Sequence, residues 1–179
     1  MQALATYYTR PMSPPWSRPL EVDRLADGEA DIDFAIPLAE LSGLRSLRGG
    51  VGGSVSGRVR FSREAGFAVA ELTLRGSATL ECQRCLRPME LALETLTRVA
   101  LIASEAEGQR VPADLEPVLA AGGRITIGEL VTEELLLTLP IVPLHAAGGE
   151  CTSAPAAAAL KEGGETHRPF ARLAELLKR

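Results

Sequence analysis

The chain has 179 residues and a formal net charge of −4, and 46% of its residues are apolar, enough for one domain with a real core. No stretch approaches the roughly 18 consecutive apolar residues of a membrane span, and the N-terminus has no signal-peptide pattern, so we expect a soluble, cytoplasmic protein without membrane contact. The acidic charge argues against a dedicated nucleic-acid binder, and 4% aromatic residues offer no stacking platform for single strands.

The first part of the chain predicts an extended arm followed by short elements. Prolines surround Trp16 in residues 1–20, which forbids regular helix there. Residues 33–37 favour a short strand and residues 38–41 a turn of helix. The glycine-rich run at 49–53 lacks a following Gly-Lys-Ser/Thr, so it does not predict a nucleotide-binding loop.

Alternating patterns then predict three strands of an antiparallel sheet. Residues 55–61 alternate apolar and polar side chains, and a turn at 63–66 reverses the chain. Residues 68–82 and 89–101 each carry apolar residues on one parity. We therefore expect a long antiparallel hairpin whose tip is the Cys-x-x-Cys turn at 82–85, in a twisted antiparallel sheet.

The next pattern predicts one helix that packs on this sheet. Thr126 and Glu129 form a capping box, the apolar run that follows indicates a largely buried helix over 128–139, and Pro140 ends it. Together these elements predict one α+β domain over 21–147. Residues 148–167 are rich in alanine and glycine and indicate a flexible segment, whereas residues 168–179 have the apolar spacing of a short amphipathic helix.

The three cysteines pose the main chemical question. Cys82 and Cys85 form a close pair of the kind that binds metal, and the exit of the predicted helix could bring His145 and Cys151 to them. An odd number of cysteines argues against a secreted disulfide framework. Three interpretations stay open: one structural zinc held by all four residues, reduced thiols without metal, or a redox pair at Cys82 and Cys85.

Other chemistry finds little support. The sequence has no nucleophile with a recognisable base and no convergent carboxylate pair, so we expect neither an enzyme nor a small-molecule substrate. Residues 43–88 contain eight arginines against three acids. This window can indicate an RNA-facing surface that includes Arg75, Arg84 and Arg87, or simply a solvated sheet face.

Several motifs in order resemble a known family. They are G-S-A-T-L-E-C-Q-R-C-L-R-P-M at 76–89, L-E-P-V at 115–118, G-E-L-V-T-E-E-L-L-L-T-L-P-I-V-P-L-H at 128–145, Cys151, and the terminal R-P-F-A-R-L-A-E-L-L-K-R. This set is similar to the bacterial YceD family, the large ribosomal RNA subunit accumulation proteins. Its C-x-R-C feature maps onto Cys82, Arg84 and Cys85, and its downstream His/Cys feature onto His145 and Cys151.

The resemblance implies a non-enzymatic role in the synthesis, processing or stability of large-subunit ribosomal RNA, in the cytoplasm. The partner would be that RNA or a ribosome assembly protein, contacted directly or indirectly. Two alternatives remain beside it: a thiol redox protein that uses Cys82 and Cys85, and a protein-interaction adaptor that uses the helix at 168–179.

Overall fold

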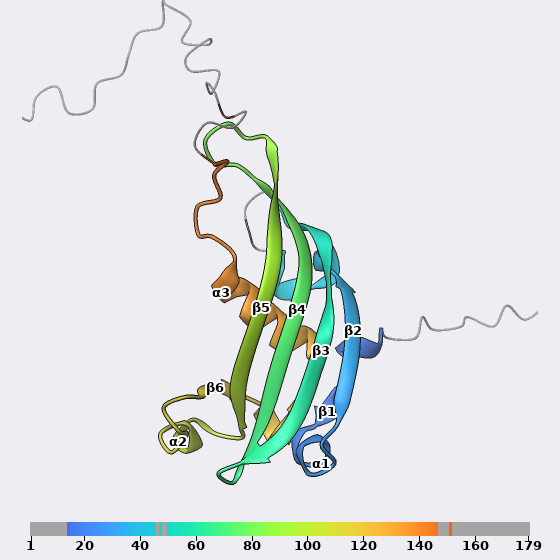
Figure 1. Cartoon of the computed structure of the whole chain (residues 1–179), viewed down its shortest axis with the longest axis vertical. Coiled ribbons are helices and arrows are strands. Elements are labelled where there is room, and N and C mark those ends of the chain that lie inside the picture. The colour runs from blue at the N-terminus through green and yellow to red at the C-terminus, as the bar shows by residue number, and fades with distance from the viewer. Residues whose placement is uncertain (1–13, 46, 48–49, 147–150, 152–179) are drawn as a thin grey trace, which may run out of the picture.

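The fold is built around one curved sheet with a helix across its inner face (Figure 1). A computed structural model describes residues 14–45, 47, 50–146 and 151. The sheet has five strands in the order β2-β3-β4-β5-β6. Their bounds are β2 Asp31–Pro37, β3 Gly52–Glu64, β4 Phe67–Glu81, β5 Pro88–Ile102 and β6 Glu116–Leu119. With the helices described below, this confirms the α+β class predicted from the sequence.

The β4–β5 pair is the longest ladder of the sheet. The two strands are antiparallel, and their register runs from Ala68 opposite Leu101 to Glu81 opposite Pro88. The apolar parity of β4 points inward, because its apolar side chains from Ala68 to Leu80 are buried while Thr73 and Arg75 are exposed. Alternation in the sequence therefore fixes which face of the hairpin forms the core.

The sheet is mixed, which corrects the prediction of a purely antiparallel one. β6 pairs with β5 in parallel, with Val99 opposite Glu116. The chain leaves β5, passes through the short helix α2 (Glu105–Gly108), and returns to the sheet edge in the same direction. Such a crossover gives a parallel strand, whereas a tight hairpin turn cannot. A two-stranded sheet joins β1 (Leu20–Glu21) to β7 (Arg124–Ile125).

Helix α3 (Ile127–Thr138) closes the core from the other side. The capping box is confirmed: Thr126 accepts a hydrogen bond from the Glu129 backbone, and the Glu129 side chain accepts one from the Thr126 backbone. Val131 and Leu135 are fully buried, but Leu136 and Leu137 are exposed. The prediction of a largely buried helix is therefore only partly right, because three consecutive leucines cannot share one helix face.

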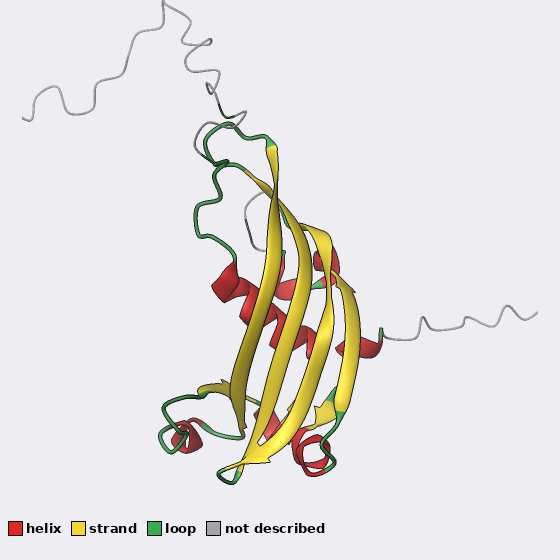
Figure 2. Cartoon of the chain, viewed as in Figure 1, coloured by secondary structure: helices red, strands yellow, loops and turns green. Residues whose placement is uncertain are grey.

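Smaller elements frame this core (Figure 2). Helix α1 (Val22–Asp27) forms in a stretch whose acidic composition did not predict a helix, and it is held through buried Val22 and Ala26. The remaining elements are single 3-10 turns at Pro15–Ser17, Leu38–Glu40, Ser42–Leu44 and Ala121–Gly123. Trp16 packs against Gly128 of α3.

The division of the chain stays a prediction. The flexible segment at 148–167 and the helix at 168–179 lie almost wholly outside the described residues, of which Cys151 alone falls in that part of the chain. No helix in the described part is long and apolar enough to cross a membrane.

Candidate metal centre at the hairpin tip

The first two cysteines lie in the turn that joins β4 to β5. The Cys82 backbone N–H donates to the Arg87 carbonyl at 3.0 Å, and the Leu86 N–H donates to the Cys82 carbonyl at 2.8 Å. Leu86 adopts a left-handed conformation with φ of 57°. These contacts close a tight loop that aims both thiols at one point, as a metal-binding Cys-x-x-Cys turn requires.

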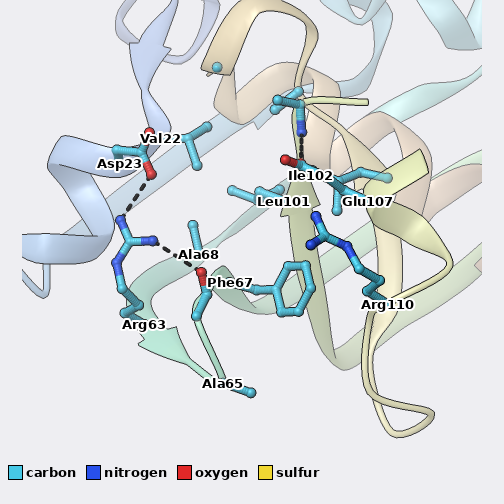
Figure 3. A pocket seen from close by; sticks show the side chains of 14 residues that line it. Val22, Asp23, Arg63, Ala65, Phe67, Ala68, Leu101, Ile102, Glu107 and Arg110 are labelled. Atoms are coloured by element: carbon cyan, nitrogen blue, oxygen red, sulfur yellow. Dashed lines mark hydrogen bonds and ion pairs between the residues drawn. The ribbon is translucent and has the colours of Figure 1, made fainter. Parts of the chain in front are cut away.

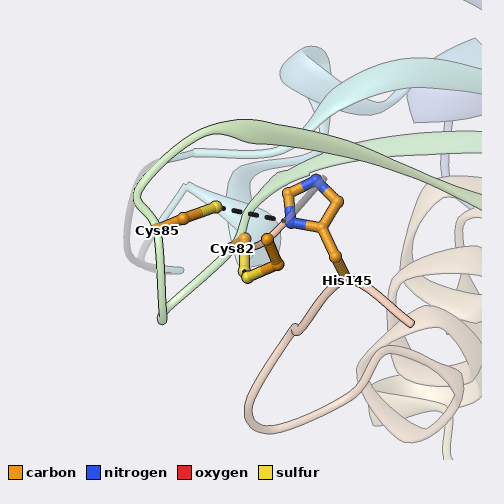
Figure 4. Close-up of side chains that lie close together, drawn as sticks. Cys82, Cys85 and His145 are labelled. Carbon is orange, nitrogen blue, oxygen red and sulfur yellow. Dashed lines mark hydrogen bonds between the residues drawn. The ribbon is translucent and has the colours of Figure 1, made fainter. Parts of the chain in front are cut away.

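The segment after α3 brings the histidine to the same point (Figure 4). The Gln83 N–H donates to the Pro143 carbonyl at 2.9 Å, which attaches this segment to the tip. The His145 Nε2 lies 3.2 Å from the Pro88 carbonyl, and its Nδ1 lies 3.4 Å from the Cys85 Sγ. A proton on Nε2 satisfies the carbonyl and leaves the Nδ1 lone pair facing the thiols, an arrangement typical of metal-bound histidines.

The third cysteine completes a cluster of four. The ligand atoms of Cys82, Cys85, His145 and Cys151 all lie within 4.8 Å of one another. The Cys82 and Cys151 Sγ atoms are 3.7 Å apart. In tetrahedral zinc coordination, two sulfurs lie about 3.8 Å apart and a sulfur and a nitrogen about 3.6 Å apart. The donor set and its spacing therefore fit a zinc ion, and all three thiols are free and buried.

Hydrogen bonds shift the protonation of this cluster toward thiolates. Burial raises the pKa of Cys82, but N–H donors from Cys85, His145 and Arg84 and the His145 imidazole together lower it to about 5. The backbone N–H of Arg87 lowers the pKa of Cys85, although burial opposes it, and the Arg87 side chain adds to the effect.

The other two groups shift upward. A hydrogen bond with Cys82 raises the pKa of His145 above its ordinary value, and burial partly opposes this. Burial first, and then the neighbouring Cys85 and Cys82, raise the pKa of Cys151. The hairpin thiols thus favour their negatively charged form, which suits a divalent cation. A bound metal would take the place of a proton on Nδ1 of His145 and keep the imidazole neutral.

The three arginines proposed as RNA contacts do not form one group. Arg84 and Arg87 lie in the tip, but Arg75 lies six residues before the end of β4, about 20 Å away along the strand. The Arg75 guanidinium contacts Glu94 at 2.9 Å on the neighbouring strand. Arg87 already donates hydrogen bonds to the Cys85 thiol through its backbone and its side chain.

Acids from other elements neutralise much of the arginine-rich window. Arg58 pairs with Asp33 at 2.7 Å and Arg60 with Asp31 at 3.1 Å, each directly across the β2–β3 ladder. Arg63 is held by Asp23 and Asp27 of α1. Except at the tip, this side of the sheet therefore matches the interpretation of a solvated face better than that of an RNA surface.

A hollow at the opposite end of the hairpin offers no comparable site (Figure 3). Arg63 faces it but is bound by Asp23 and, at 3.4 Å, by the Gly66 carbonyl. Among the described residues, the cluster at the tip is the only group of three or more side chains placed to hold a metal ion.

Sequence reasoning missed two parts of the centre. The carbonyls of Pro88 and Pro143, which orient the histidine and attach its segment, carry no side-chain signal. The left-handed conformation of Leu86 was also not foreseen, because glycine is the usual residue there. Only an unusual Leu-Arg-Pro after the second cysteine could have pointed to this turn.

Fold and site together define a small α+β protein with a Cys3His cluster at the tip of its central hairpin. The family model described as "Large ribosomal RNA subunit accumulation protein YceD" matches residues 70–177, which include all four candidate ligands. The chain therefore belongs to the YceD family.

A curated relative agrees with this assignment. The Large ribosomal RNA subunit accumulation protein YceD of Haemophilus influenzae is 36% identical over 67 residues, which are 37% of this chain and 38% of that protein. The chain thus aligns with well under half the length of this relative. No solved structure matches the chain.

Proposed function

We propose that this protein is a non-enzymatic factor that promotes the accumulation of large-subunit ribosomal RNA in the cytoplasm, and that one structural zinc ion holds its hairpin tip. Family membership carries the first half of the proposal. The convergence of four metal-ligating side chains carries the second. Both concern the same part of the molecule, because the family match contains most of the hairpin, all of α3 and all four ligands.

Zinc is the metal we propose because of the donors. Three soft thiolates and one imidazole favour zinc over magnesium or calcium, which prefer oxygen ligands. Four protein ligands leave no open coordination position, so the ion would be structural and would supply no catalysis. Its role would be to tie the β4–β5 tip to the segment after α3, across the sequence separation of 69 from Cys82 to Cys151.

The tip is the part of the molecule that we propose to contact RNA or an assembly protein. It presents Arg84, for which no ion pair is found among the described residues. It also presents Leu86, which is 68% exposed. A cation beside an exposed apolar side chain on a rigid turn suits either partner, and a metal-held turn would keep both in place.

A genetic experiment tests the role in RNA accumulation. Deletion of the gene should lower the ratio of large-subunit to small-subunit ribosomal RNA, and the wild-type gene should restore it. The Arg84→Ala variant should restore it only in part, whereas Arg75→Ala should restore it fully because Glu94 already pairs with that side chain. An unchanged ratio in the deletion strain would overturn the proposed function.

A thiol redox role is the second candidate. The close approach of two sulfurs and the pKa of about 5 for Cys82 favour it. Cys82 could then form a disulfide with either of two partners. One is Cys151, whose Sγ lies 3.7 Å away, and the other is Cys85 in the same turn. Mild oxidation of the native protein should leave all thiols titratable after denaturation if zinc occupies the site, and should consume two of them if the redox role is correct.

A further inference from the structure

The strongest feature outside the metal centre is an apolar strip between α3 and the tip. Five large apolar side chains within nine residues are exposed there: Leu136, Leu137, Ile141, Val142 and Leu144. Leu137 is 75% exposed and Ile141 95% exposed. Single exposed apolar residues are ordinary, but five within one short stretch of chain are not, and apolar side chains gathered in one region of a surface mark a place that something covers.

The strip also has a defined place and charge. It runs from the last turn of α3 to the metal centre, along the segment that rises from the helix in Figure 1, and it ends one residue before His145. Helix α3 contains three glutamates and no lysine or arginine. Glu133 lies one helical turn before Leu137 on the same side of α3, so acid and apolar groups adjoin there.

The C-terminal sequence complements this surface. Residues 168–179 lie outside the described residues; they contain four basic residues and one acidic residue. Phe170, Leu173, Leu176 and Leu177 recur at the spacing of a helix face. A helix of this kind would place leucines on the strip while its arginines and lysine face the glutamates of α3.

The chain length allows this contact. Cys151 is fixed in the cluster, beside the end of the strip. The 18 residues between Cys151 and Phe170 would span about 23 Å on average as a flexible linker. The strip from Leu137 to Leu144 is at most about 25 Å long. A linker matched to the distance gives a high effective concentration, so even a modest interface stays closed.

We propose that residues 168–179 dock on the strip of the same chain and cover Leu137 and Ile141. The docked segment then lies next to the metal centre, so residues 168–179 and the hairpin tip form one continuous surface. This inference does not depend on the identity of the metal or on the role in ribosomal RNA.

Methyl relaxation by a soluble gadolinium chelate tests the proposal in the full chain. Methyl groups of Leu96, which is 66% exposed on the outer face of the sheet, serve as the internal reference. In the wild-type protein, Leu137 and Ile141 should relax more slowly than Leu96, although both are more exposed in the structure. In a Leu173→Asp/Leu176→Asp variant they should relax as fast as Leu96 or faster.

A matched control comes from the linker. Leu160→Asp changes one apolar residue outside the proposed helix and should leave the relaxation of the strip unchanged. Fast relaxation of Leu137 and Ile141 in the wild-type protein would overturn the proposal. So would protection that grows with protein concentration, which indicates a second copy, or protection that survives the double substitution, which indicates another occupant.

Discussion

Cys82 and Cys151 are 69 residues apart in the sequence, yet their Sγ atoms lie 3.7 Å apart at the tip of the central hairpin. Two buried thiols meet here without a disulfide. Around Cys82 the structure places N–H donors from Cys85, Arg84 and His145 rather than apolar side chains alone. A bound metal ion explains this combination better than packing does.

Removal of the metal should destabilise the protein strongly. A structural zinc ion contributes on the order of 10 kcal/mol of binding free energy, and its ligands would otherwise repel one another. We expect a strong chelator to lower the melting temperature of the wild-type protein, as measured by circular dichroism. The His145→Ala variant should start at the lower value and not respond to chelator.

The second histidine provides the control. The four converging residues already supply a full tetrahedral ligand set without His167, so His167→Ala should keep the wild-type melting temperature and the wild-type response to chelator. A chelator response that persists in His145→Ala would contradict the proposed ligand set.

Metal retention should depend on pH. Folding lowers the pKa of Cys82 from its ordinary value of 9.0 to about 5, so the thiolate contributes stability that is fully present above pH 9 and is lost as the pH falls through about 5. Protons also compete with the metal for the thiolates and for His145. We expect zinc release, followed with a chromogenic chelator, between about pH 6 and pH 4. Release that is complete at pH 7, or absent at pH 4, would contradict this assignment.

The left-handed conformation of Leu86 predicts that substitution by glycine does not destabilise the protein. A non-glycine residue at φ of 57° costs about 1 kcal/mol, and the exposed side chain loses little burial on removal. The Leu86→Gly variant should therefore keep or raise the melting temperature, whereas Leu86→Val should lower it because a branched side chain tolerates this conformation poorly. Equal losses in both variants would show that the side chain, not the backbone, matters there.

A substitution on the buried face of α3 tests how this helix packs in the hydrophobic core. Leu135 is fully buried between α3 and the sheet, so Leu135→Ala should cost about 2–5 kcal/mol of unfolding free energy. The same change at exposed Leu96 should cost less than about 0.5 kcal/mol. Chemical denaturation of both variants measures the difference. Similar costs would mean that α3 is not packed on the sheet as described.

Contact with RNA at the tip has its own test. Arg84→Ala should weaken binding to large-subunit ribosomal RNA and reduce its dependence on salt, because one phosphate contact is lost. Arg75→Ala should change neither, since Arg75 is paired with Glu94. Equal effects of the two substitutions would place the RNA surface on the sheet rather than on the tip.

Local patterns in the sequence predicted much of the fold. Alternation marked β3, β4 and β5, and the Thr126 capping box marked the start of α3. The sequence did not predict the parallel edge strand, because the direction of β6 depends on the path of the crossover rather than on its own residues. The sequence also did not predict α1. Half of its residues are charged, so the pattern did not indicate that Val22 and Ala26 are buried and anchor the helix.

The candidate site was also only partly predictable from the sequence. The Cys82 and Cys85 pair is evident from spacing alone, but the convergence of His145 and Cys151 depends on where α3 ends and on the hydrogen bond from Gln83 to Pro143. The window of residues 43–88 left two interpretations open, and the ion pairs favour the solvated face for part of it, because the acids that neutralise Arg58 and Arg60 come from the preceding strand. Cross-strand pairing is invisible until the register is known.

The most direct test of the central claim is the metal content of the purified native protein, measured by elemental analysis beside the Cys151→Ser variant. Cys151 is the ligand farthest in sequence from the hairpin, so it decides whether the four residues act as one site. We predict about one zinc ion per wild-type chain and its loss in the variant. A wild-type protein without metal, or a variant that keeps its zinc, would show that these four residues do not form one zinc site.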